Sequence, residues 1–162
     1  MRELKFYFSP IGALTAEFED GFLVGLSFGR NGEETDLTEP NESVYKRTRE
    51  WLDEYFSGRK PEFDLPIKLS GTPFRNMVWE RLKSIKYGQT VTYGEIAEEA
   101  ARLSGKSKMS AQAVGGAVGK NPIAIIVPCH RVLGKNEKIT GYAGGVDKKA
   151  ELLKIEGIDF VF

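Results

Sequence analysis

The sequence is poor in two residues that carry much protein chemistry. Its 162 residues include one cysteine, Cys129, and one histidine, His130. A single cysteine excludes an internal disulfide, which suits a chain that works in a reducing compartment such as the cytoplasm. One cysteine and one histidine also fall short of the four ligands of a standard zinc site. We therefore expect no metal, and we find no motif for another cofactor.

Long apolar runs are absent as well. No segment approaches the roughly 18 consecutive apolar residues of a membrane-spanning helix, and residues 1–12, MRELKFYFSPIG, lack the apolar stretch of a secretion signal. Hydrophobic residues make up 41% and charged residues 28% of the chain, the balance of an ordinary globular protein. We expect a cytoplasmic protein without a membrane partner.

The chain has no excess charge of one sign, because 23 basic residues balance 23 acidic ones. The distribution is nevertheless uneven. Residues 31–66 hold 10 acidic and 5 basic side chains, whereas residues 81–135 hold 9 basic and 3 acidic ones. An anionic partner such as nucleic acid would be attracted by the second half, although two solvated surfaces would give the same counts.

The first third of the chain has the pattern of a small sheet and a helix. LKFYFS, ALTAEF and FLVGLSF are rich in β-formers, and Asp20-Gly21 between the last two is a hairpin turn signal. NESVYKRTREWLDEYFSG predicts an amphipathic helix, whose apolar face comprises Val44, Trp51, Leu52, Tyr55 and Phe56. With a boundary near Gly71, we expect domains at 1–70 and 71–162.

The remainder favours helices. Thr72-Pro73 is a helix start, and TYGEIAEEAARLSG opens with a capping box. SAQAVGGAVGKNP predicts a further short helix, so the two consecutive segments suggest a helix-turn-helix in an α/β (α+β) protein. Gly115 and Gly116 each cost about 1 kcal/mol relative to alanine. Either they pack against a neighbouring helix, or they let a partner such as the minor groove of DNA approach the backbone.

The single thiol and the single imidazole are adjacent, in NPIAIIVPCHRV. IAIIV reads as a buried strand or strand-like run that Pro128 ends, which would present Cys129 and His130 at the end of a rigid element. A lone intracellular cysteine is most often a small buried apolar residue. A reactive thiol needs a neighbouring base or positive field, and this histidine is the obvious candidate.

These segments carry a resemblance to a known family. PFRNMVWERL, GQTVTYGEIA, AVGGAVGKNP, PCHRV, GYAGG and LLKIEG occur in the order found in O6-alkylguanine-DNA alkyltransferases, over residues 73–157. The resemblance implies a ribonuclease-H-like N-terminal domain and a DNA-binding C-terminal domain. It also implies direct DNA repair without a cofactor, in which Cys129 takes the alkyl group of O6-alkylguanine once and irreversibly after base flipping. O4-alkylthymine is a further candidate substrate.

The resemblance assigns roles to individual residues. Cys129 resembles the acceptor, His130 the base that acts through a water, Glu156 the carboxylate that orients the histidine, and Asn121 the hinge asparagine. The substrate-binding positions are Tyr93, Val132, Tyr142 and Ala143. The expected DNA-binding residues are Lys108, Gln112, Ala113, Gly115, Lys120 and Arg131.

The sequence departs from the family pattern in the predicted recognition helix and the guanine pocket. Gln112 stands where relatives commonly have an arginine, and Ala143 where some have a serine. The resemblance implies a monomer that binds double-stranded DNA through the minor groove, largely independently of sequence. A lesion-binding protein with little transfer activity is the main alternative. A cysteine hydrolase would need a histidine remote in sequence, and a sequence-specific regulator would need base-reading side chains on 110–119.

Overall fold

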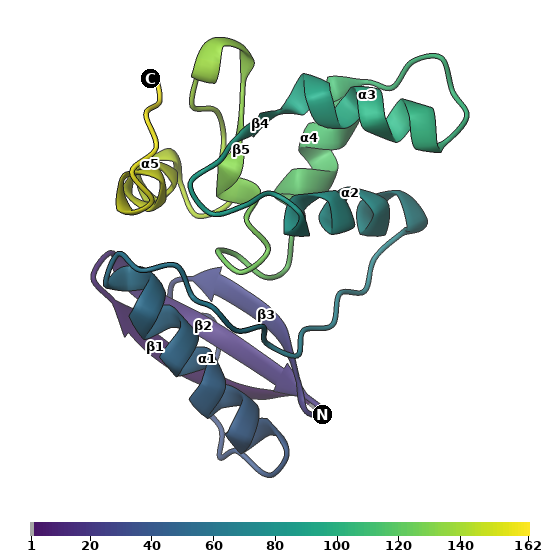
Figure 1. Ribbon diagram of the computed structural model, residues 1–162. Helices are drawn as coiled ribbons and strands as arrows, with labels where there is room; N and C mark the ends of the chain where they lie inside the picture. The colour runs from purple at the N-terminus through teal and green to yellow at the C-terminus, as the bar shows by residue number, and fades with distance from the viewer. Residues whose placement is uncertain (1) are drawn as a thin grey trace. The chain divides into compact units, whose positions relative to one another are not determined.

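The computed structural model describes residues 2–162, and the chain forms two compact units. One unit contains the chain up to Leu69 together with Pro122–Ala124, and the other contains Ser70–Asn121 and Ile125–Phe162. Figure 1 labels the helices and strands of both.

The first unit is built on a three-stranded antiparallel sheet. Its strands are β1 (Glu3–Ser9), β2 (Gly12–Glu19) and β3 (Phe22–Phe28), in the order β1-β2-β3. Asp20 and Gly21 both have positive φ, 51° and 82°, as a type I′ hairpin turn requires, so the predicted turn is confirmed. The outer edge of β3 is bridged by Ile67 and Ile123.

One helix, α1 (Asn41–Phe56), covers a face of this sheet (Figure 1). Leu14, Ala16 and Phe18 alternate along β2 and are fully buried, as expected of side chains that share one face of a strand. The predicted helix face is largely confirmed, because its core residues Val44, Leu52 and Tyr55 are buried; Trp51 and Phe56 are only half-buried.

The second unit begins with three helices, α2 (Pro73–Lys83), α3 (Tyr93–Leu103) and α4 (Ala111–Gly119). The predicted helix starts are confirmed: Thr72 caps α2, and Thr92 forms a capping box with Glu95 at α3. The helices pack on one another, and the buried Trp79 of α2 donates its Nε1–H to the carbonyl of Ala117 in α4 at 2.9 Å.

Short elements and one more helix complete this unit. The strands β4 (Val91–Thr92) and β5 (Val132–Leu133) pair in parallel, and the 3₁₀ turns η1 (Cys129–Arg131) and η2 (Lys135–Glu137) flank β5. Helix α5 (Val146–Ile155) packs against η1. A small core joins β5 to α5 through Leu133, Ile139, Ala150 and Leu153.

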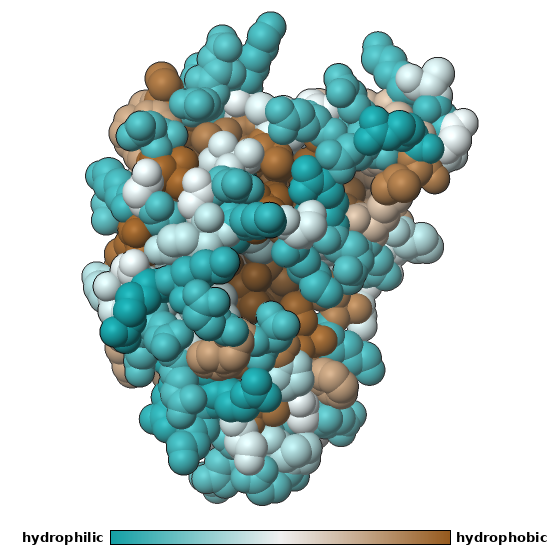
Figure 2. Space-filling view, viewed as in Figure 1, coloured by the Kyte–Doolittle hydropathy of each residue, from teal (hydrophilic) through white to brown (hydrophobic). Residues whose placement is uncertain are grey.

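Hydrophilic residues cover most of the face seen in Figure 2, and the hydrophobic residues there form separate patches. Between residues 2 and 162, no helix is both long enough and apolar enough to cross a membrane.

Candidate active site

The segment before Cys129 is a series of turns rather than the expected strand, so that prediction is wrong. Ile125 has a φ of 70°, which a β-branched residue rarely adopts and which no strand accommodates. Pro128 lies at φ −81° and ψ 66°, and the N–H of Cys129 donates to the carbonyl of Val127 at 2.8 Å. Cys129 and His130 therefore lie on the tight turn η1, not on an extended run.

His130 and Glu156 meet inside the second unit although 26 positions separate them. The imidazole Nε2 lies 2.5 Å from Oε2 of Glu156, and neither side chain is exposed. Glu156 caps the C-terminus of α5, where its charge opposes the helix dipole. Two donors compensate: Nε of Arg131 at 2.8 Å and the N–H of Gly88 at 3.0 Å both bind Oε1.

Burial and the neighbouring charges together fix the protonation states of Glu156 and His130. Burial would raise the pKa of the Glu156 carboxyl, but hydrogen bonding and charge from His130 and Arg131 outweigh it and hold the pKa at about 2. Burial lowers the pKa of His130 despite the nearby carboxylate. At neutral pH the carboxylate is thus ionised and the imidazole neutral. Its Nε2 carries the proton donated to Glu156, and its Nδ1 carries the basic lone pair.

Cys129 is buried, and its surroundings keep the sulfur protonated at rest. Burial raises the pKa of the thiol, while hydrogen bonding with the Asn121 side chain and the positive charge of Lys149 act in the opposite direction. Asn121 also donates its Nδ2–H to the carbonyl of Val127 at 2.7 Å, which ties the end of α4 to the turn. A base must remove the thiol proton before the sulfur can attack an alkyl carbon.

Lys149 is a residue at this site that the sequence analysis missed. Its side chain is fully buried on α5, and its Nζ lies 5.7 Å from the centre of the Tyr93 ring, with no hydrogen-bond acceptor among residues 2–162. Burial lowers its pKa to about 8. The sequence contains a pattern that could have indicated this residue. Helical spacing of i, i+3, i+4 and i+7 places four residues on one face: Lys149, Leu152, Leu153 and Glu156.

The predicted substrate-binding residues belong to the same unit, but only some of them surround the thiol. Tyr93 begins α3, and its hydroxyl lies 3.4 Å from Oγ1 of Thr140. Tyr142 interacts with Cys129; burial, together with this neighbour, raises its pKa. Val132 is buried in β5, and Ala143 is exposed. Their roles in recognising a base stay predictions.

The predicted recognition helix α4 presents a bare surface. Ser110 caps it, Val114, Ala117 and Val118 face the core, and Gln112 and Ala113 are exposed. A Cβ on Gly116 would meet no atom of residues 2–162 within 4 Å, and one on Gly115 would be in ordinary contact with Tyr93 at 3.9 Å. Tight helix packing therefore does not explain these glycines.

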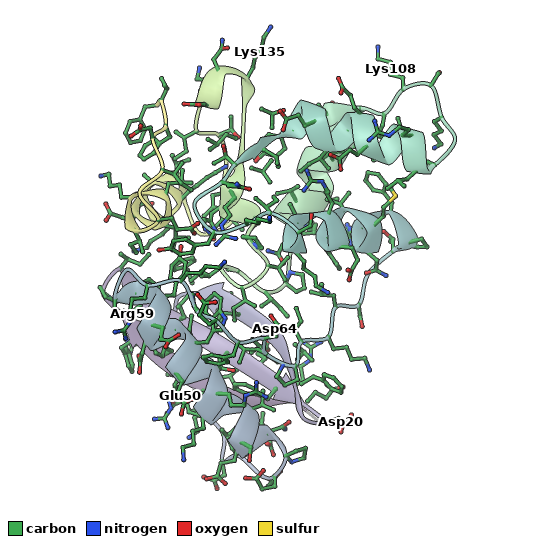
Figure 3. All side chains as sticks on the ribbon, in the orientation of Figure 1. Asp20, Glu50, Arg59, Asp64, Lys108 and Lys135 are labelled. Atoms are coloured by element: carbon green, nitrogen blue, oxygen red, sulfur yellow. The ribbon has the colours of Figure 1, made fainter. Side chains whose placement is uncertain are left out.

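Lysines flank this helix, and the arginine of the PCHRV motif points inward. Lys108 projects from the connection between α3 and α4 (Figure 3), and Lys120 follows α4; both are exposed. Arg131 is 7% exposed, and its guanidinium donates to Glu156 and to the carbonyl of Ile85. These two contacts hold the guanidinium inside the unit, and its role as a DNA-binding residue stays a prediction.

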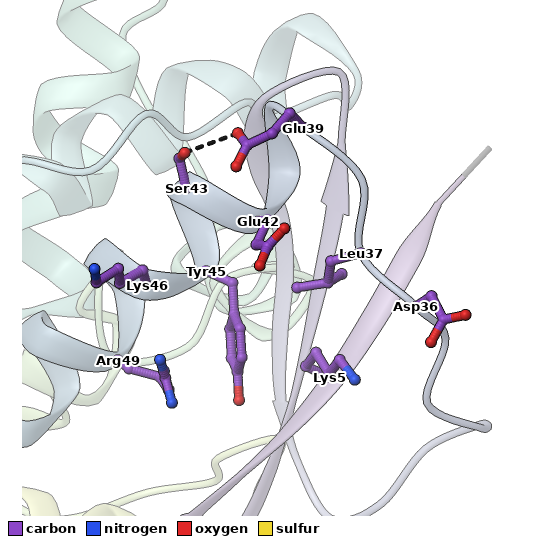
Figure 4. Close-up of a pocket in the computed structure, with 9 residues that line it drawn as sticks. All are labelled: Lys5, Asp36, Leu37, Glu39, Glu42, Ser43, Tyr45, Lys46 and Arg49. Atoms are coloured by element: carbon purple, nitrogen blue, oxygen red, sulfur yellow. Dashed lines mark hydrogen bonds between the residues drawn. The ribbon is translucent and has the colours of Figure 1, made fainter.

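A cleft of about 650 Å³ in the first unit offers no comparable chemistry (Figure 4). Its charged lining mixes three cations with three carboxylates: Lys5, Lys46, Arg49, Asp36, Glu39 and Glu42. Ser43 donates its hydroxyl to Glu39 at 2.7 Å and has no imidazole beside it. No cluster of three or more histidine, cysteine or carboxylate side chains between residues 2 and 162 could hold a metal ion.

Comparisons with known proteins agree on one family over both units. Residues 73–158 match the model of the 6-O-methylguanine DNA methyltransferase DNA-binding domain, and residues 4–69 match that family's ribonuclease-like domain. The methylated-DNA–protein-cysteine methyltransferase of Methanosarcina acetivorans is 43% identical over 152 residues, which cover 92% of this chain and 94% of that protein.

Solved structures give the same result. The crystal structure of the O6-methylguanine methyltransferase of Mycobacterium tuberculosis superposes with a TM-score of 0.78 at 38% identity, covering 96% of this chain and 93% of that one. A second crystal structure, of Mycobacterium tuberculosis OGT in complex with DNA, superposes with a TM-score of 0.78 at 41% identity, covering 95% of this chain and 92% of that one. The expected ribonuclease-like first domain is confirmed.

Proposed function

This chain belongs to the 6-O-methylguanine DNA methyltransferase family, and we propose on that premise that it repairs DNA by moving the alkyl group of O6-alkylguanine to its own Cys129. The observation that carries the proposal is the buried turn on which the chain's one thiol is next in sequence to its one imidazole, whose Nε2 contacts Glu156 at 2.5 Å.

The geometry supports a short sequence of steps for the transfer. Neutral His130 takes the thiol proton on Nδ1, through a water, as the family resemblance implies. The sulfur attacks the alkyl carbon, a sulfur–carbon bond forms, and the carbon–O6 bond breaks. The proton released from the thiol balances the proton that guanine gains, so the base leaves neutral. The thioether product has no easy reverse reaction, and each molecule therefore acts once.

We assign the remaining predicted residues to positioning and recognition. Asn121 holds the turn by its bond to Val127. Tyr93 and Tyr142 have hydroxyls near the thiol side of the site, where a flipped guanine must lie. Val132 and Ala143 contribute backbone groups. Residues 71–162 would thus carry both recognition and chemistry, and 1–70 would form a separate domain.

DNA binding is assigned to α4 and its surroundings. Gln112, Ala113, Gly115 and Gly116 leave a low surface that suits the narrow minor groove, and Lys108 and Lys120 are placed to contact phosphates. One chain contains the whole site, which supports action as a monomer. A reducing compartment such as the cytoplasm suits a thiol that must stay unoxidised.

Intact-protein mass spectrometry tests the transfer. Incubation with a duplex that carries one O6-methylguanine should add the mass of one methylene group, reach one equivalent per protein and stop. Cys129→Ser and an unmodified duplex are the controls, and neither should show the gain. An unchanged mass with the damaged duplex still bound would overturn the proposal in favour of a lesion-binding protein.

A further inference from the structure

Arg131 is a buried cation, and no step of the proposed transfer involves it. Its side chain is 9% exposed; Nε donates to Glu156 and one terminal nitrogen to the carbonyl of Ile85, each at 2.8 Å. The guanidinium carbon lies 5.7 Å from the centre of the Tyr87 ring. Burying a charge in this way is costly, and an apolar side chain of similar size is often as stable. The position of Arg131 therefore calls for a functional reason.

We propose that Arg131 is a positioning residue that occupies half of the Glu156 carboxylate and so keeps His130 neutral and able to accept the thiol proton. The inference rests on the proposed function, in which His130 is the base for Cys129. It differs from the DNA-contact role expected from the sequence, because Arg131 would act only through Glu156.

The division of the carboxylate is the geometric basis. Oε2 of Glu156 faces His130, whereas Oε1 accepts from Arg131 and from the N–H of Gly88. A buried carboxylate that faced an imidazole alone would favour the imidazolium, because opposite charges in contact stabilise each other. Guanidinium is permanently charged, so Arg131 already neutralises Glu156.

The charge count shows which protonation state the burial favours. With Arg131 present, the group of Arg131, Glu156 and neutral His130 has a net charge of zero, and protonation of the ring would leave an excess positive charge in a buried site. Without Arg131, the neutral combination is Glu156 with a protonated His130. When the thiol proton moves to His130, the thiolate of Cys129 restores a net charge of zero.

The other groups around His130 do not reverse this count. Lys149 of α5 adds positive charge and disfavours a protonated ring further. Tyr87, which faces Arg131 and Glu156, and Tyr142, which faces Cys129, both have a pKa raised by burial and stay neutral, as does the thiol. Burial first, and then Arg131 and Lys149, lower the pKa of His130 against the effect of Glu156.

Because the chain has one histidine, an NMR titration of the histidine ring reports on His130 alone. We would titrate the His130 ring by NMR in the whole protein and in Arg131→Met and Arg131→Lys. Arg131→Met should raise the pKa of His130 by about one pH unit or more. Arg131→Lys keeps the charge and should raise it less. Arg102→Met removes an exposed arginine in the same unit and should leave the titration unchanged.

The pH dependence of methyl transfer gives a second readout. If His130 must be neutral, the acid limb of the rate profile should move to higher pH in Arg131→Met by the same amount as the NMR titration. A purely structural loss would lower the rate at every pH without moving the limb. Should Arg131→Met not fold, Glu156→Gln provides the opposite test, because removal of the carboxylate should lower the pKa of His130.

An unchanged His130 titration in folded Arg131→Met, or a rise in Glu156→Gln, would overturn the inference. The titration needs no DNA, so its failure is distinguishable from failure of the proposed function. Absence of methyl transfer in the unmodified protein would contradict the proposed function and leave the coupling between Arg131 and His130 to be judged by the NMR result alone.

Discussion

Lys149 lowers the stability of the second unit and favours the reactive form of Cys129. Its ammonium group is buried and finds no hydrogen-bond acceptor in the described part of the chain, which costs free energy. The same charge opposes the effect of burial on the Cys129 thiol. The residue therefore weakens the fold at the place where it favours the thiolate, as polar groups at functional sites commonly do.

Lys149→Met should separate these two effects. We expect the free energy of unfolding of the second unit to rise by about 1–3 kcal/mol, because the unsatisfied ammonium is removed. The rate of methyl transfer should fall, because the thiolate loses a nearby positive charge. Unfolding by denaturant and single-turnover transfer kinetics would measure them.

The pKa of Lys149, about 8 in the fold, sets the pH window. The stability gain should be largest below pH 8 and should shrink as the pH rises from there toward the ordinary value of 10.5. Lys154→Met, an exposed change on the same helix, should alter neither quantity. Unaltered transfer kinetics in Lys149→Met would contradict the electrostatic role.

At the scale of elements, local sequence signals predicted most of the helices and strands. The β2–β3 turn and the caps of α2 and α3 were predictable, because each depends on the chemistry of a few neighbouring residues. The turns of the segment IAIIV were not predictable, because an apolar composition suits any buried backbone conformation. A positive φ at Ile125 is imposed by the packing around it, which no local pattern reveals.

The candidate site also has features that the sequence predicts and features that it does not. The adjacency of Cys129 and His130 was visible in the sequence, whereas the approach of Glu156 was inferred only from a family resemblance. The inward direction of Arg131 was hidden, because one arginine can bind a phosphate outside or a carboxylate inside. The fold brings Glu156 and Ile85 to it as hydrogen-bond acceptors, and no local pattern in the sequence indicates these partners.

The exposed surface of helix α4 at Gly116 leads to a testable prediction. Gly116 has helical backbone angles and open space around it, so Gly116→Ala should stabilise the unit by about 1 kcal/mol, and Gly116→Gln by about half as much. Both should weaken duplex binding, and glutamine more, because its longer side chain would hold the helix away from the groove. Denaturant unfolding and fluorescence anisotropy with an unmodified duplex measure the two quantities. Equal affinity of the glutamine variant and the unmodified protein would exclude close approach at this position.

At the scale of the whole molecule, charge follows the division into units. The acidic stretch 31–66 lies within the first unit, and the basic stretch 81–135 lies, except for Pro122–Ala124, in the second. The net charge of zero therefore hides a positive unit that holds α4 and the thiol. Attraction to phosphate should fall with salt and should depend on the second unit.

The single histidine also makes the pH dependence of stability unusually simple to interpret. The fold lowers the pKa of His130, so the unfolded chain binds this proton more readily. The free energy of unfolding should therefore fall as the pH drops from 7 to 5, through the ordinary histidine value of about 6.5, by up to about 1.4 kcal/mol per pH unit. Glu156, with a pKa of about 2, acts only below about pH 4.5, and Lys149 only above about pH 8.

Denaturant unfolding between pH 5 and pH 8 would measure this dependence. Trp79 reports on the second unit once Trp51 of the first is replaced by phenylalanine. His130→Gln keeps a side-chain donor for Glu156 and removes the titration, so its unfolding free energy should be flat over the same interval even if its absolute value is lower. A slope that persists in His130→Gln would mean that another group titrates there. A slope of opposite sign in the unmodified protein would mean that His130 is protonated in the fold, and His130 would then be unable to serve as the base for Cys129.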